Sequence, residues 1–365
     1  MISYILDSVL RFLLCTTILM FFIALAACSD YPSVTSVYET PEVDTKGDAA
    51  DDPAIWTNLD SPNNSLIFGT DKRAGVYVYD LKGSKVGYTA LGEINNIDLR
   101  IIESETYIVG SNRTDQTIDL WIVKNEDLKD GASDKNFSLN QSPSISESTD
   151  VNVYGICAGF DKEFGLIFFA TEDEGPSVEM WNYRNGSMQR LLTFDNGGES
   201  EGCVYDDYDR SLFISEEDSN GVLKAYDLTA YPDLSNYKVV DSREGNIGGD
   251  PEGVALYKTS SVAGYIILSS QGDSKFNLYR RQAPYQYIGS FMVTDSDRLF
   301  REYVDGVSET DGIDAVNFSF NSTFDSGLLV VQDDKNDCNN CDEKRQNFKY
   351  IDFKDVEQVL NLTIF

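Results

Sequence analysis

One arrangement of apolar and polar positions recurs along the chain: a short apolar run, a polar cluster and a second apolar run. LIFGTDKRAGVYVYDL and YIVGSNRTDQTIDLWIV are two examples. Val, Ile, Tyr and Phe dominate the apolar runs and turn-forming residues interrupt them, so the pattern predicts strands rather than helices. Six copies start at Leu66, Tyr107, Leu166, Leu212, Tyr265 and Leu328.

A shorter apolar segment precedes each copy and opens with polar residues, as in DDPAIW, NNIDLR and DPEGVALY. The copies start 41 to 63 residues apart, which leaves room for about four short strands in each unit. We therefore predict an all-β fold, a six-bladed β-propeller. A β-sandwich is the alternative, but it does not account for six copies of one unit.

The repeat also predicts where the acidic residues lie. The leading strand of a blade and the next strand are antiparallel, so the start of one meets the end of the other. Around a ring, this geometry gathers carboxylates at one mouth of the central channel. Carboxylates packed so closely require a cation among them, and a set of hard oxygen ligands favours Ca²⁺ over Mg²⁺.

The composition narrows the chemistry further. The chain has 29 Lys and Arg against 61 Asp and Glu, a net charge of −32, and no histidine. A Ser-His-Asp triad, a histidine base and a His-ligated zinc are therefore excluded. So negative a protein is a poor partner for nucleic acid or an anionic membrane surface.

The N-terminus carries an export signal in our interpretation. An uncharged apolar run over residues 12–27 is shorter than a membrane span, and it ends in Leu25-Ala26-Ala27-Cys28, which resembles the bacterial lipobox. We expect a lipoprotein signal peptide at 1–27, a lipidated Cys28, a tether at 28–46 and the propeller at 47–365. The protein would then be exported and anchored to the cell envelope by its lipid alone, at the outer membrane in a Gram-negative host, or extracellular.

Four further cysteines agree with export. Cys338 and Cys341 enclose two residues, and we expect a small disulfide there. Cys157 and Cys203 each lie in a strand-like run, and we interpret them as small buried hydrophobic residues.

A few basic residues interrupt the acidic mouth. Lys72 and Arg73 follow Asp71, and Arg113 follows Asn112, both at strand ends that face the mouth. Cations beside Ca²⁺ suggest an anionic ligand such as phosphate. Salt bridges to neighbouring acids are the alternative.

A series of short strings, in one order over residues 47–356, resembles the β-propeller phytases. They include DDPAIW, NNIDLR, SNR, VYG, SEED, DPEG, SSQG, TDGIDA and QNFK. The resemblance implies a calcium-dependent 3-phytase with several Ca²⁺ ions, a phosphoric monoester hydrolase that releases phosphate from myo-inositol hexakisphosphate (phytate). We expect a monomer in which water attacks phosphorus directly. A lactonase-like calcium-dependent propeller hydrolase and a non-catalytic binding propeller are the alternatives.

The resemblance also implies roles for individual residues. The catalytic calcium ligands at the mouth would be Tyr154, Glu201, Glu217, Glu252 and Asp311, with Asp250 beside them. Asp52, the Pro53 carbonyl and Ile97 would hold a structural ion, and we expect Asp333 to be a further metal ligand. Lys72, Arg73 and Arg113 would bind phosphate. Where the family commonly has a phosphate-binding Lys-Glu, this chain has Glu172-Asp173-Glu174-Gly175.

Overall fold

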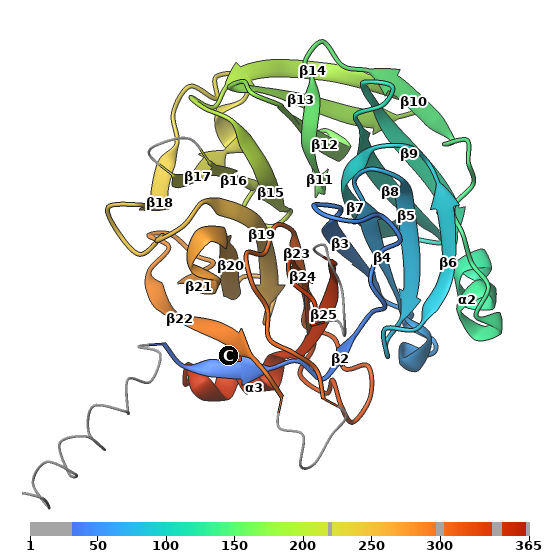
Figure 1. Cartoon of the computed structure of the whole chain (residues 1–365). Helices are drawn as coiled ribbons and strands as arrows, with labels where there is room; N and C mark the ends of the chain where they lie inside the picture. The colour runs from blue at the N-terminus through green and yellow to red at the C-terminus, as the bar shows by residue number, and fades with distance from the viewer. Residues whose placement is uncertain (1–30, 218–220, 297–302, 338–344, 363–365) are drawn as a thin grey trace, which may run out of the picture. The chain divides into compact units, whose positions relative to one another are not determined.

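The structure is a computed structural model that describes residues 31–217, 221–296, 303–337 and 345–362. From Ser33 onward, six small sheets are arranged in a ring (Figure 1). Each sheet is one blade. The strand that precedes each apolar repeat copy lies at the centre of the ring. The predicted six-bladed β-propeller is confirmed.

The first three blades each contain four consecutive antiparallel strands. The first holds β3 (Ala50–Trp56), β4 (Leu66–Asp71), β5 (Gly75–Asp80) and β6 (Lys85–Ala90). The second holds β7 (Ile94–Ile102), β8 (Glu105–Asn112), β9 (Thr117–Lys124) and β10 (Ile145–Ser148). The third holds β11 (Val153–Asp161), β12 (Gly165–Glu172), β13 (Ser177–Arg184) and β14 (Ser187–Asp195).

The last three blades follow the same order but recruit two strands from the N-terminal segment. The fourth holds β15 (Ser200–Asp206), β16 (Ser211–Glu216), β17 (Val222–Asp227) and β18 (Lys238–Ser242). The fifth holds β19 (Pro251–Lys258), β20 (Gly264–Ser270), β21 (Lys275–Arg280), β22 (Tyr287–Thr294) and β1 (Ser33–Thr35). The sixth holds β23 (Ile313–Val316), β24 (Leu328–Asp333), β25 (Asn347–Asp352) and β2 (Tyr38–Glu39).

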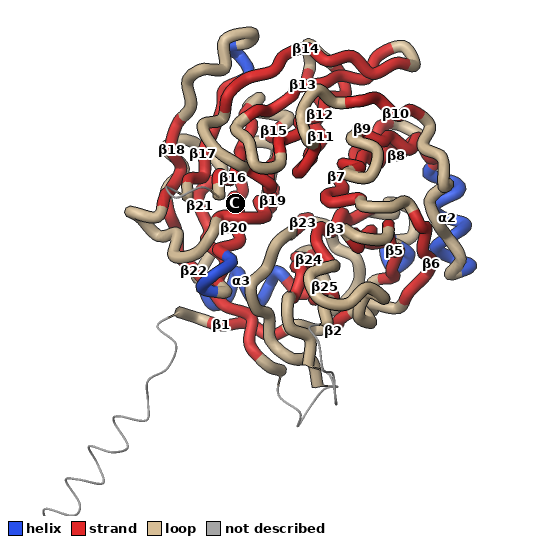
Figure 2. The backbone as a smooth tube through the Cα atoms, turned by 45° about the horizontal axis from the view of Figure 1, so that its top comes forward, coloured by secondary structure: helices blue, strands red, loops and turns tan. Residues whose placement is uncertain are grey.

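Residues 33–39, within the expected tether, belong to the propeller. β1 pairs with β22 in parallel and β2 pairs with β25 antiparallel; Figure 2 labels β1 and β2 at the edge of the ring. Val34 is buried in the core beside β22, and Tyr38 pairs with Tyr350. The tether prediction is therefore wrong from Ser33 onward, because these short segments complete blades whose other strands lie near the C-terminus.

The hydrophobic core is divided among the interfaces between neighbouring blades. In the described residues, six clusters fill these interfaces. Trp56 of the first blade packs in one cluster with Trp121 of the second. Tyr79 of the first blade packs with Phe348 of the sixth, ring centroids 6.2 Å apart, which closes the ring.

In the described part of the chain, two α-helices lie outside the repeat. α2 (Asn125–Asp134) connects β9 to β10, and α3 (Phe353–Val359) follows β25. Short 3-10 turns occupy Pro62–Asn64, Leu228–Ala230 and Gln271–Asp273. Within the residues that the structure describes, no helix is both long and apolar enough to span a bilayer.

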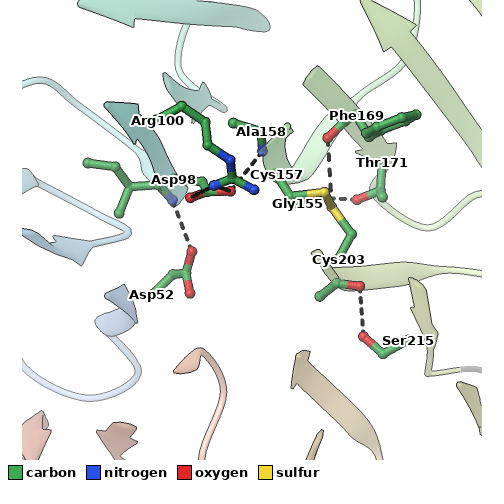
Figure 3. The surroundings of a disulfide bond; sticks show 12 residues. Asp52, Asp98, Arg100, Gly155, Cys157, Ala158, Phe169, Thr171, Cys203 and Ser215 are labelled. Carbon is green, nitrogen blue, oxygen red and sulfur yellow. Dashed lines mark hydrogen bonds and ion pairs between the residues drawn. A yellow bond between two sulfur atoms is a disulfide. The ribbon is translucent and has the colours of Figure 1, made fainter. Parts of the chain in front are cut away.

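A disulfide joins two neighbouring inner strands. Cys157 on β11 is bonded to Cys203 on β15 (Figure 3). Our interpretation of the two as separate buried thiols is wrong, because the packing of adjacent inner strands brings their Cα atoms to 5.7 Å, within disulfide range. Cys28 and the expected Cys338–Cys341 pair lie outside the described residues.

Candidate active site

The inner strands of several blades begin at the same mouth of the channel. Tyr154 lies on β11, Glu201 on β15 and Glu252 on β19, and Asp311 comes two residues before β23. These four side chains, with Lys72, line one cavity of about 430 Å³. The remaining lining residues are Asp48, Gln271, Gly272, Glu309 and Asp334.

A glycine follows each of these four mouth residues, and it allows the next blade to approach closely. A Cβ at Gly155 would lie 1.9 Å from the Glu201 carbonyl oxygen, and one at Gly202 would lie 2.2 Å from that of Glu252. Gly253 donates its N–H to the Asp311 carbonyl at 2.9 Å. Because backbone packs against backbone, consecutive blades bring their acidic side chains together. The repeated pairs Tyr-Gly, Glu-Gly and Asp-Gly are the sequence signal for this packing, which sequence reasoning missed.

Three of the predicted calcium ligands converge most closely. Carboxylate oxygens of Glu201, Glu217 and Glu252 all lie within 4.8 Å of one another. Glu217 follows β16, and its N–H donates to the Glu199 carbonyl at 3.0 Å. Among the described residues, Glu217 Oε1 and Glu252 Oε2 are buried without a hydrogen-bond partner.

The electrostatics of this trio favour a bound cation. Burial, followed by repulsion from Glu199, raises the pKa of Glu217 to about 8. Burial and repulsion by Glu217 and Glu201 raise the pKa of Glu252 well above its usual range. Two buried carboxylate oxygens without partners and a set of hard oxygen donors fit a divalent cation such as Ca²⁺.

Lys72 lies at the mouth as predicted, but carboxylates surround it. Its Nζ is 2.9 Å from Asp51 Oδ1, 2.9 Å from Asp48 Oδ1 and 3.2 Å from Asp311 Oδ2. Burial, partly offset by Lys72, raises the pKa of Asp311 to about 7. Arg73, in contrast, is exposed and is not among the residues that line the mouth cavity.

Arg113 lies over the ring of Tyr154, 5.4 Å from its centroid. Its Nη1 donates to Asn95 Oδ1 at 3.1 Å, and its Nη2 donates to Asp173 Oδ2 at 3.0 Å. Asn95 in turn donates to Glu201 Oε1 at 2.6 Å. Repulsion by Glu201, followed by burial, raises the pKa of Tyr154. Asn95 is thus a site residue that the sequence analysis passed over, although it opens the string NNIDLR.

The predicted structural-ion residues lie elsewhere in the channel. Asp52, Pro53 and Ile97 line a second cavity of about 360 Å³, further along the inner strands, with Arg100 and Asp314. Asp52 accepts the Ile97 N–H at 3.1 Å (Figure 3). The structure therefore brings these three residues together but separates them from the mouth cavity.

Asp51, the residue before Asp52, belongs to the mouth instead. It is fully buried, pairs with Lys72 and accepts the Gly312 N–H through its carbonyl at 3.1 Å. Asp51 therefore contacts Lys72 of the mouth, whereas Asp52 lines the second cavity, and only Asp52 was predicted.

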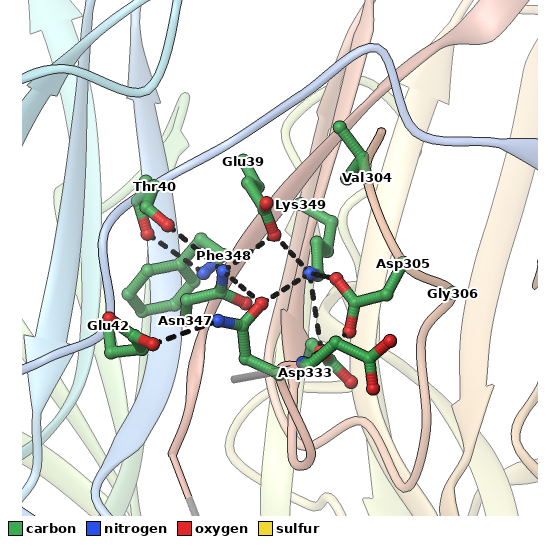
Figure 4. A network of polar contacts seen from close by, with 12 residues as sticks. Glu39, Thr40, Glu42, Val304, Asp305, Gly306, Asp333, Asn347, Phe348 and Lys349 are labelled. Carbon is green, nitrogen blue, oxygen red and sulfur yellow. Dashed lines mark hydrogen bonds and ion pairs between the residues drawn. The ribbon is translucent and has the colours of Figure 1, made fainter. Parts of the chain in front are cut away.

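Two other predicted metal ligands have protein cations beside them. Asp333 lies 3.5 Å from Lys349 Nζ, which also contacts Glu39 and Asp305 (Figure 4). Asp250 is half exposed and forms an ion pair with Arg243. Neither Asp333 nor Asp250 lines the mouth cavity.

Comparisons with known proteins agree with this architecture. The sequence profile of the family described as Phytase matches residues 2–363. A 3-phytase of Bacillus subtilis (strain 168) is 31% identical over 342 residues, covering 90% of this chain and 85% of the relative. A solved luciferin-regenerating enzyme is similar in fold, with a TM-score of 0.52 at 10% identity, covering 84% of this chain and 92% of that one. The chain therefore belongs to the β-propeller phytase family and is an enzyme of that family.

Proposed function

We propose that this protein is a calcium-dependent phytase of the 3-phytase type, which hydrolyses phosphomonoesters of phytate at the channel mouth. The carboxylate trio of Glu201, Glu217 and Glu252 carries the proposal, because its oxygens lie within 4.8 Å of one another and two of them are buried without partners. The 31% identical relative is a 3-phytase, which supports the choice of substrate.

The residues of the mouth divide into two groups. Glu201, Glu217, Glu252, Asp311 and Tyr154 would hold calcium. When bound, Ca²⁺ would neutralise phosphate oxygens and activate the water that attacks phosphorus.

Arg113 and Lys72 bind and orient the phosphate. The Arg113 guanidinium is about one-third exposed at the mouth, so it can donate to phosphate oxygens. Lys72, which lines the mouth cavity, adds a second positive charge: burial lowers its pKa, but the charges of Asp51, Asp311 and Glu201 outweigh burial and keep it protonated. The exposed Arg73 has no part in this arrangement.

Phosphate release from phytate tests the proposal. We expect the purified protein to release phosphate in Ca²⁺ and to stop when a chelator is added. Release that persists unchanged in the chelator would remove calcium from the mechanism. No release from phytate in Ca²⁺ would favour a lactonase-like hydrolase or a binding propeller.

We also propose that the protein is exported and held at the cell envelope through a lipid on Cys28. The Cys157–Cys203 disulfide supports export, since disulfides persist in oxidising compartments. Cys28→Ala should move the protein from the membrane fraction to the soluble fraction. Retention of the variant in membranes would contradict the anchor.

A further inference from the structure

The guanidinium of Arg113 is shared with an acid from the next blade. Arg113 lies in the turn after β8, and Asp173 follows β12. We propose that Asp173 is a specificity-determining residue that competes with substrate phosphate for Arg113 and thereby weakens the binding of inositol polyphosphates. This inference rests on the proposed phytase function.

The backbone holds Asp173 in place for this contact. The Asp173 N–H donates to the Asn152 carbonyl at 2.8 Å, which fixes the start of the turn after β12. From there its Oδ2 accepts from Arg113 Nη2 at 3.0 Å. The side chains of Arg113 and Asp173 are 31% and 30% exposed, so water screens the pair and a phosphate can replace the carboxylate.

The other contacts of Arg113 limit the guanidinium N–H groups that a phosphate could reach. Nη1 already donates to Asn95, and one face of the guanidinium lies over Tyr154. Phosphate binds Arg best through two parallel N–H donors. Nη2 is therefore the donor for which phosphate and Asp173 compete, and the carboxylate also repels a phosphate dianion at that position.

Removing one negative charge at each of two positions separates this competition from a general effect of charge. Asp173→Asn keeps the shape of the side chain but removes its charge. Asp115→Asn is the matched control, because Asp115 is exposed two residues from Arg113 and its carboxylate forms no hydrogen bond or ion pair within the described part of the chain. Arg113→Ala supplies the background in which the competition no longer exists.

We expect Asp173→Asn to lower the KM for phytate about five-fold, with kcat within about two-fold of the parent and an unchanged Tm. Asp115→Asn should leave both constants unchanged. In the Arg113→Ala background, Asp173→Asn should have no effect on KM. An unchanged or raised KM for Asp173→Asn, or an equal gain without Arg113, would overturn the inference.

Calorimetric binding of phytate in the presence of Ca²⁺ distinguishes this inference from the proposed function. Tighter binding by Asp173→Asn that depends on Arg113 would support the inference even if the wild-type protein released no phosphate. Hydrolysis by the wild type, together with equal phytate binding by wild type and Asp173→Asn, would uphold the function and overturn the inference.

Discussion

At the scale of single residues, the mouth is defined by which charges find partners and which do not. Lys72 contacts three carboxylates, whereas one oxygen each of Glu217 and Glu252 is buried without a partner in the described part of the chain. The site therefore holds negative charge that no protein cation compensates and that a bound metal ion would neutralise, while the partly exposed Arg113 can donate to an anionic ligand.

The sequence predicts that Arg113 and Arg73 both bind phosphate, whereas the structure leads us to expect different effects when each is replaced. Arg113→Ala should raise the KM for phytate at least as much as it lowers kcat, because in the proposed function the guanidinium would contact phosphate in both the bound and the transition state. Arg73→Ala should change neither constant, since Arg73 lies outside the mouth cavity. Steady-state kinetics of the two variants at saturating Ca²⁺ is the measurement. Equal effects of the two substitutions would contradict the placement of the phosphate.

Sequence reasoning identified the acidic mouth residues but not their surroundings. Glu201, Glu217 and Glu252 could be predicted because each opens or closes a strand of the repeat. Asn95 and Asp51 could not, because their roles depend on side-chain direction within an irregular strand start, where the ladder register shifts between Ala50 and Pro53. The partner of Asp333 also depends on a tertiary contact, with Lys349 sixteen residues later in the chain.

At the scale of strands, the approach of one blade to the next sets the geometry of the site. Glycine after each mouth residue permits this approach, and a disulfide locks one such pair of strands, β11 and β15. The strand pattern was predictable from apolar periodicity. The pairing of β1 and β2 with distant strands was not, because segments of two or three residues carry no periodic signal.

Gly202→Ala tests the close approach. The added methyl group would lie 2.2 Å from the Glu252 carbonyl oxygen, and the backbone there cannot move without displacing β19. We expect a loss of about 1–3 kcal/mol in the free energy of unfolding and weaker calcium activation. Gly289→Ala on β22 is the control, since its new methyl group would meet only the Leu360 side chain. Equal stability of the two variants in thermal unfolding would refute the argument.

The disulfide should contribute to stability by closing a long loop. Cys157 and Cys203 are 46 residues apart, for which chain entropy gives an upper value of about 4 kcal/mol. The double variant Cys157→Ser, Cys203→Ser should melt at a lower temperature than the wild type. A reductant should lower the Tm of the wild type by more than it lowers that of the double variant. Peptide mapping of the unreduced wild type that finds Cys157 and Cys203 as free thiols would show that the bond is absent.

At the scale of the whole molecule, the chain has a net charge of −32, and the ring of blades gathers several of its acidic side chains around one cavity. Burial raises the pKa of Glu217 to about 8 and that of Asp311 to about 7, from usual values of 4.5 and 3.8. Between about pH 4 and pH 8, the folded protein without metal therefore binds more protons than the unfolded chain. Its stability must fall as pH rises from about 4 to about 8.

Calcium should cancel this pH dependence, because a bound ion compensates the ionised carboxylates and stabilises the native state. Thermal unfolding in a chelator should show a Tm that decreases steadily from pH 5 to pH 8. In millimolar Ca²⁺ the Tm should be higher, with the largest gain at the alkaline end. A chelated protein whose Tm stays constant or rises over this interval would contradict the electrostatic account.

The central claim is that Glu217 helps hold the calcium on which phytate hydrolysis depends. Its most direct test is a calcium titration of the rate of phosphate release, comparing the wild type with Glu217→Gln. The variant should need far more Ca²⁺ and lose at least about a hundred-fold in kcat, while its Tm in a chelator equals or exceeds that of the wild type, since a repelling buried carboxylate is gone. A variant with the wild-type calcium dependence and turnover would contradict the account.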